Sequence, residues 1–123
     1  MTDLVDLLNT NNVIEELCLG SNMISNDGIS TLAKFLGSNS TLRHLDICKN
    51  SFSDIGFEPF ARAMGVNRGI THLDISKNNH ITDNGSLLYL VDSLITNETL
   101  QKLDLSGLQA RKPFFVRKFK AAL

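Results

Sequence analysis

The sequence has no tryptophan, one tyrosine and two prolines among its 123 residues, and it has no long apolar run. A membrane-spanning helix would need about 20 apolar residues in succession. The first residues, MTDLVDLLNTNN, carry acids where a secretory signal peptide would carry bases. Only two cysteines are present, Cys18 and Cys48. These features predict reduced thiols in a cytosolic or nuclear setting, and we expect the cytoplasm.

Catalytic signatures are also missing. The chain has no nucleophile elbow, and its glycine-containing stretches, GSN and DNG, are typical of turns and not of a loop that cradles phosphate groups. No segment indicates an element that would form a pocket. We therefore predict that the chain is not an enzyme and requires no cofactor.

Acidic residues are absent from one end of the chain. Residues 109–123 contain five bases and no acid, whereas residues 1–108 contain 13 acids and seven bases. The formal net charge of −1 hides these two opposite balances. The asymmetry predicts that the C-terminal segment is an element separate from the rest.

A repeat dominates what the sequence does contain. Units of 28 residues begin at Ile14 and Leu42, a unit of 30 residues begins at Ile70, and LQKLDLSG opens a fourth unit at Leu100. The similarity is plainest between the stretches LRHLDICKN and ITHLDISKN. Self-similarity at such a period is typical of a solenoid of stacked units.

Apolar residues occupy fixed positions in each unit. Alternation of apolar and polar residues predicts a short half-buried strand at the start of the unit. The inward strand positions are Leu17 and Leu19, Leu45 and Ile47, Leu73 and Ile75, and Leu103 and Leu105. Pairs spaced four apart predict the inward side of a helix later in the unit. These pairs are Leu32 with Leu36, Phe60 with Met64, and Leu90 with Leu94.

Asparagine and glycine also recur at fixed offsets. One asparagine follows each strand and is expected to bond the backbone of the turning chain: Asn22, Asn50 and Asn78. One glycine is expected in a tight turn before each helix: Gly28, Gly56 and Gly85. A second asparagine is expected to end each helix in the left-handed conformation: Asn39, Asn67 and Asn97. Asn39 and Asn97 also begin glycosylation sequons, which we interpret as parts of the repeat.

The pattern LxxLxLxxN, followed by an apolar position, glycine and LxxxL, resembles the leucine-rich repeats of the ribonuclease-inhibitor-like class. Cytosolic innate-immune receptors, Ran GTPase-activating proteins and tropomodulins carry repeats of this class. The resemblance covers about residues 4–107 and departs at the fourth unit, where Leu108 stands in place of asparagine. It implies an α/β fold: a right-handed solenoid with parallel strands on the concave face and helices on the convex face.

This reading divides the chain into three parts. Residues 1–13 are expected to form an N-terminal half-repeat or cap helix, and residues 14–108 about three and a half repeats. Residues 109–123 are expected to form a basic C-terminal cap helix. The chain begins in the middle of a repeat, either as a natural cap or as a piece of a longer array. Its open N-terminal end therefore offers a surface for self-association.

Polar residues that alternate with the inward leucines face outward and form rows across the strands. The first row holds Glu16, His44, His72 and Lys102, and the second holds Cys18, Asp46, Asp74 and Asp104. Since neighbouring strands lie about 4.8 Å apart, the aspartates form a column of like charges. We expect this column to favour protonated histidines beside it, which would make the face pH-sensitive.

Three interpretations of this face compete. In the first, it is a protein-binding groove whose acids meet basic groups on a partner. In the second, the aspartates are only the outward strand residues that are common in this class of repeat. In the third, His44, His72, Asp46 and Cys48 bind zinc. Zinc requires ligands that converge to within about 2.3 Å of one point, and a sheet face splays side chains apart.

We favour the first interpretation, a protein–protein interaction module. Its predicted partner-binding residues are Glu16, His44, Asp46, His72, Asp74, Lys102 and Asp104. The partner is expected to be another protein and not nucleic acid, because the acidic body would repel phosphate groups.

The basic segment QARKPFFVRKFKAAL suggests an alternative function. Pro113 suits the first position of a helix. Apolar residues would then line one side, and the basic side would present Arg117, Lys118 and Lys120. As a cap, this helix would cover the apolar edge of the last repeat. As a contact element, it would bind a partner in a cytoskeletal or GTPase-regulating end piece or, less favourably, a membrane surface.

Overall fold

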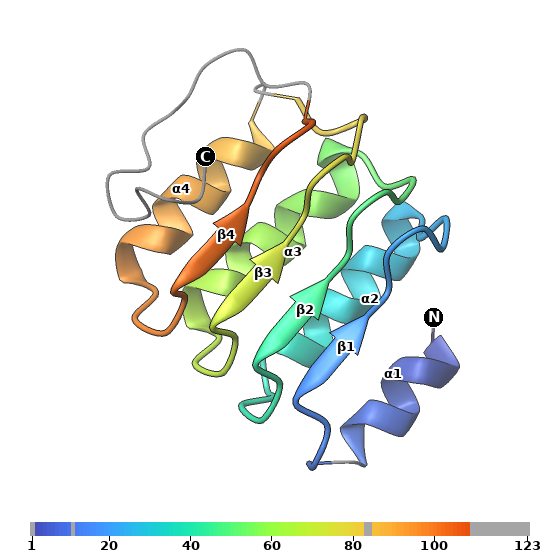
Figure 1. Ribbon diagram of the computed structural model, residues 1–123, viewed down its shortest axis with the longest axis vertical. Coiled ribbons are helices and arrows are strands. Elements are labelled where there is room, and N and C mark those ends of the chain that lie inside the picture. Colours follow the sequence, from blue (N-terminus) through green and yellow to red (C-terminus); the bar gives the residue numbers. More distant parts are fainter. Residues whose placement is uncertain (1, 11, 83–84, 109–123) are drawn as a thin grey trace.

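The computed structural model describes residues 2–10, 12–82 and 85–108 (Figure 1). Helices and strands alternate along the chain: α1 (Thr2–Asn9), β1 (Glu16–Cys18), α2 (Asn26–Leu36), β2 (His44–Asp46), α3 (Asp54–Val66), β3 (His72–Asp74), α4 (Ser86–Thr96) and β4 (Lys102–Asp104). The strands are parallel and pair in the order β1-β2-β3-β4. Figure 1 shows the helices stacked behind this sheet. The α/β solenoid predicted from the repeat, with strands on the concave face and helices on the convex face, is confirmed.

The core lies between the sheet and the helices. The predicted inward residues of the second and third strands, Leu103 of β4 and the three inward helix pairs are buried, whereas Leu105 is only partly buried. Phe52, Phe57 and Phe60 fill the middle of the array, with ring centroids 6.1 Å and 5.6 Å apart. Leu17 and Leu19 are only half-buried, because no described strand lies beyond β1.

The asparagines that follow the strands bond successive repeats together. The side-chain amide of Asn78 donates to the carbonyl oxygens of Ile47, Ile75 and Ser76 at 3.1, 2.8 and 3.4 Å, and its Oδ1 accepts from the Asn50 backbone N–H at 2.8 Å. Asn50 bonds the first repeat in the same manner. The predicted role of these two asparagines is therefore confirmed.

A second row of asparagines differs from the prediction. Asn67 and Asn97 end their helices with φ of −65° and −70° and ψ of 134° and 131°, which is extended and not left-handed backbone. Both side chains are buried and bond across repeats. Asn97, for example, donates to the Met64 carbonyl oxygen at 2.7 Å and accepts from the Leu100 N–H at 2.7 Å. Because the side chain of Asn97 is buried and bonds the backbone, the sequon at Asn97 is explained by the structural role of this asparagine in the repeat.

Two of the three glycines lie in helices and not in the predicted turns. Gly28 and Gly56 belong to α2 and α3, and both are buried. A Cβ on Gly56 would lie 2.6 Å from the Cα of Asn26, so glycine is needed for close packing of α3 on α2. Gly85 alone has the positive φ, 134°, that suits a glycine turn before a helix.

The basic C-terminal segment 109–123, with Arg117, Lys118 and Lys120, lies outside the described residues. Its prediction as a cap helix therefore stays a prediction. Within the described ranges, none of the helices has the length and apolar character needed to cross a membrane.

Candidate functional site

The concave face brings the predicted partner-binding residues together. Across the sheet, Glu16 pairs with His44, His44 with His72, and His72 with Lys102, so the first predicted row is correct. The second row is also correct, since Cys18, Asp46, Asp74 and Asp104 pair in that order. A groove of about 320 Å³ runs over the strands, and all seven predicted residues line it, together with Cys18, Leu17, Leu45 and Leu73.

Each aspartate of the column holds the turn that follows its own strand. The Oδ1 atoms of Asp46 and Asp74 accept from the backbone N–H two residues later, of Cys48 and Ser76, at 2.9 and 2.8 Å. Asp104 Oδ1 accepts from the N–H and the hydroxyl of Ser106 at 2.9 and 2.7 Å. Among the described residues, the second carboxylate oxygen of Asp74 and of Asp104 has no hydrogen bond, so these charges remain available.

The two histidines lie against each other in the groove. Their ring centroids are 4.2 Å apart and the rings are tilted by 34°. His44 Nδ1 lies 3.5 Å from the Glu16 carboxylate, and His72 Nδ1 lies 2.9 Å from the Thr71 hydroxyl oxygen.

The expectation that the aspartates favour protonation is wrong for His72. Burial lowers its pKa from the ordinary 6.5, and the neighbouring His44 and Lys102 lower it further. The two residues that flank His72 in its own row therefore act on its pKa, and the aspartates of the adjacent column are not among the causes of its shift. At neutral pH this ring is uncharged.

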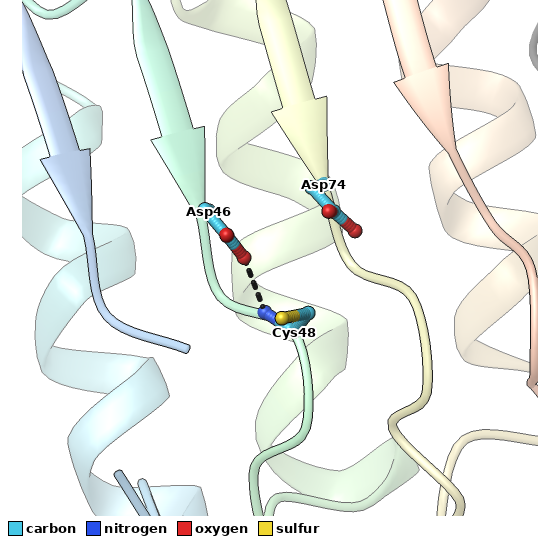
Figure 2. Close-up of side chains that lie close together, drawn as sticks. All are labelled: Asp46, Cys48 and Asp74. Carbon is cyan, nitrogen blue, oxygen red and sulfur yellow. Dashed lines mark hydrogen bonds between the residues drawn. The ribbon is translucent and has the colours of Figure 1, made fainter. Parts of the chain in front are cut away.

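A third group lies at the edge of the groove, where Asp46, Cys48 and Asp74 come together (Figure 2). Their possible ligand atoms all lie within 4.8 Å of one another. Burial and the hydrogen bond with Asp46, with the charges of both aspartates, raise the pKa of Cys48 to about 11. The thiol is thus protonated at neutral pH.

The zinc set considered from the sequence is not assembled in this arrangement. His44 and His72 lie two outward positions away from Cys48, with the aspartate column between them, and in the described part of the chain they do not join the cluster around it. The repeat pattern did not indicate that Cys48 packs over Gly20, where a Cβ would approach the Cys48 Sγ to 2.9 Å. We therefore regard Cys48 as a packed side chain beside the groove.

The groove carries an excess of negative charge. Four acids line it, Glu16, Asp46, Asp74 and Asp104, against the single base Lys102. Because the pKa of His72 is lowered, this ring does not offset the negative charge near pH 7. A partner with basic groups would meet complementary charge along the sheet.

Comparison with known proteins agrees with the repeat and the fold. A family model described as a leucine-rich repeat matches residues 38–61 and 66–85. Among solved structures, leiomodin-1 actin-binding site 2 is similar, with a TM-score of 0.77 at 21% sequence identity. The match covers 87% of this chain but only 62% of the leiomodin-1 chain. A search of curated proteins found no match. The repeat, the parallel sheet and these similarities show that the chain contains leucine-rich repeats and has the fold of a leucine-rich-repeat solenoid.

Proposed function

We propose that this chain is a protein–protein interaction module that binds the basic groups of a partner protein in its concave groove. The column Asp46, Asp74 and Asp104 carries the proposal. It offers one carboxylate on each of three strands, at a spacing of about 4.8 Å. The proposed activity is binding and not catalysis, and the cytoplasm is its proposed compartment.

The geometry of the column supports recognition of a partner. Each aspartate is already held by a bond to its own turn, so little side-chain freedom is lost when a partner binds. Complementary charge mainly increases the rate and the specificity of association. We therefore expect partner binding to weaken as salt concentration rises.

Amide variants test this proposal without breaking the turns. In Asp46→Asn with Asp74→Asn, each side chain keeps the oxygen that accepts from the turn but loses its charge. Asp27→Asn with Asp92→Asn makes the same charge change at exposed positions on the convex helices α2 and α4. Affinity capture from native lysate should recover a partner with wild type and with the convex variant, and lose it with the groove variant. Equal recovery of the same partner by all three proteins would contradict the proposal.

A second candidate function is regulation of actin. It is favoured by the structural similarity to leiomodin-1 actin-binding site 2 and by the basic C-terminal segment. In this alternative the chain is a cytoskeletal end piece that binds actin, with Arg117, Lys118 and Lys120 pairing with acidic groups of the filament.

Co-sedimentation with purified filamentous actin tests the alternative. Wild type should pellet with the filaments, and Arg117→Gln with Lys118→Gln and Lys120→Gln should not. A matched control removes three exposed bases of the repeats: Lys34→Gln, Lys49→Gln and Lys77→Gln. Wild type that stays in the supernatant would exclude this candidate, while the groove proposal would stand on its own test.

A further inference from the structure

A second groove lies on the convex side of the molecule, between α3 and α4, and has a volume of about 360 Å³. It is here called the helix groove. Its floor forms where two small residues let the helices approach: a Cβ on Gly65 would lie 3.3 Å from the Cβ and Oγ of Ser93. Larger side chains line its walls, Arg62 and Val66 from α3 and Tyr89 from α4. The helix groove shares no residue with the concave groove on the strands.

Arg62 is held in one position at the wall of the helix groove. Its guanidinium carbon lies 4.1 Å from the centre of the Tyr89 ring, and its Nε lies 3.5 Å from the carboxylate of Glu58, one helical turn earlier. Glu58 and Tyr89 thus hold the guanidinium group from two sides, although the Arg62 side chain is 57% exposed. A cation that is already positioned loses little side-chain freedom when it binds an anion.

The edge of Arg62 that remains is the one that binds carboxylates. Among the described residues, its two terminal nitrogens donate no hydrogen bond. The other two described arginines differ, because they hold the backbone of the repeats. Arg43 Nη1 donates to two carbonyl oxygens at 2.7 and 2.9 Å, and Arg68 Nη1 donates to two others at 2.9 and 3.1 Å. Arg62 instead presents parallel N–H groups that match the two oxygens of a carboxylate.

The rest of the helix groove suits a peptide next to that carboxylate. Val66 is 63% exposed and offers an apolar surface for an aliphatic side chain. Asp92 lines the groove from α4, and within the described ranges no ion pair joins it to Arg62. The carboxylate of Asp92 is therefore an acceptor for the backbone N–H groups of a bound segment.

The preceding pair of helices does not repeat this arrangement. Lys34 of α2 takes the repeat position of Arg62, and Pro59 of α3 takes that of Tyr89, counted from the inward pair of each helix. Between α2 and α3 this place therefore has neither a planar guanidinium group nor an aromatic ring. Since α2 and α3 pack without them, the pairing of Arg62 with Tyr89 is not required by the repeat itself.

We propose that the helix groove docks an extended segment of a partner protein in which an acidic residue stands next to an aliphatic one. The carboxylate of the segment binds the terminal nitrogens of Arg62, its aliphatic side chain packs on Val66, and its backbone N–H groups donate to Asp92. The charge of this segment is opposite to that of the groups proposed for the concave groove, so the two grooves recognise different chemistry.

Titration of the isotope-labelled full chain with a capped peptide, followed by its amide signals, tests the proposal. The probe is N-acetyl-Leu-Glu-Leu-amide, whose one charge is the glutamate side chain, and its neutral match is N-acetyl-Leu-Gln-Leu-amide. The glutamate peptide should shift the signals of Gly65, Tyr89 and Ser93 saturably, with a dissociation constant of roughly 1 mM. The glutamine peptide should bind roughly tenfold more weakly, because it lacks the charge-assisted hydrogen bonds to Arg62.

Variants of the protein separate the planar guanidinium group from its charge. Arg62→Gln should weaken binding of the glutamate peptide roughly tenfold and leave the glutamine peptide unchanged. Arg62→Lys keeps the charge but loses the paired N–H groups, so it should still bind more weakly than wild type. Tyr89→Leu should also weaken binding, because the guanidinium group loses the ring that holds it. Lys34→Gln is the matched control, since it removes a base from the same repeat position of α2, and it should bind as wild type.

Equal binding of the two peptides, or unchanged binding by Arg62→Gln, would overturn the proposal. The absence of a saturable shift up to about 10 mM peptide would do the same. Arg62 and Lys34 are exposed, so both variants should fold, and the amide spectrum reports this directly. The test of the concave groove is independent, because it leaves Arg62 unchanged and the probe used here carries no base.

Discussion

Asparagine and aspartate both recur at fixed offsets in successive repeats, but they have different roles. Asn78 is fully buried, and its bonds reach from the third repeat into the second. Asp74 lies in the same repeat, but its carboxylate accepts a hydrogen bond only from the turn of its own repeat, and it lines the groove. Recurrence at a fixed offset therefore marks two separate tasks, one that joins repeats and one that presents charge.

The largest effect on stability should come from removing one of the asparagines that bond successive repeats, Asn50 and Asn78, here called the asparagine ladder. Asn78→Ala leaves the carbonyl group of Ile75 and the N–H of Asn50 without their side-chain partner, and it removes one of the two amide donors to the Ile47 carbonyl oxygen. We expect the free energy of unfolding in urea to fall by roughly 3 kcal/mol or more, since each unsatisfied buried group costs about 1–3 kcal/mol.

Asn22→Ala is the matched control, because Asn22 is exposed and its side chain donates only to the Gly20 carbonyl oxygen, at 3.1 Å. Its cost should stay below about 1 kcal/mol. Equal losses for Asn22→Ala and Asn78→Ala would show that the ladder does not join the repeats as described.

A second prediction concerns the close contact of α2 with α3. In Gly56→Ala the gain in helix propensity, about 1 kcal/mol, is opposed by a Cβ that would meet Asn26 and Ile29 at 2.6–2.7 Å. Because backbone must move, we expect a net loss of about 1–3 kcal/mol in the free energy of unfolding. Gly37→Ala, at a helical φ of −64° with its nearest contact at 3.4 Å, should be neutral or stabilise by up to about 1 kcal/mol. If Gly56→Ala raised the free energy of unfolding, the close packing of α3 on α2 at this position would be contradicted.

The two tasks of Asp74 can be separated by two substitutions. Asp74→Ala removes both the charge and the bond to the Ser76 N–H, and should lower stability by about 1 kcal/mol. Asp74→Asn keeps the acceptor oxygen and should change stability by less than about 0.5 kcal/mol. Both variants should weaken partner binding, which is measured beside the urea titrations. If only the alanine variant weakens binding, the column acts through the shape of the turn and not through its charge.

Much of the fold followed from the sequence because the signals repeat at fixed spacing. The inward positions and both outward rows depend only on the period of two residues along a strand and on the stacking of units. The conformation of Asn67 and Asn97 did not follow, because asparagine suits both a left-handed helix end and a buried backbone bond. The prediction that Gly56 lies in a turn was wrong for a similar reason. Glycine is required there because Asn26 of the neighbouring helix packs against it, which the sequence pattern does not show.

The candidate site was predictable in its membership but not in its electrostatics. Alternation along the strands placed all seven residues on one face. The sequence could not show that His72 has basic neighbours within its row, nor that Cys48 packs over Gly20 beside two carboxylates. Such properties depend on which side chains touch in space.

The smallest effect is a dependence of stability on pH through His72. Because burial, His44 and Lys102 lower its pKa in the folded state, the unfolded chain binds this proton more readily. The free energy of unfolding is therefore unaffected by this group above the ordinary pKa of 6.5, and it decreases as pH falls from there towards the lowered pKa of the folded state. Wild type should lose more stability between pH 7.5 and pH 5 than His72→Gln. Urea titrations at the two pH values measure the difference. A larger loss in His72→Gln would mean that the aspartate column, and not the row of basic neighbours, governs this ring.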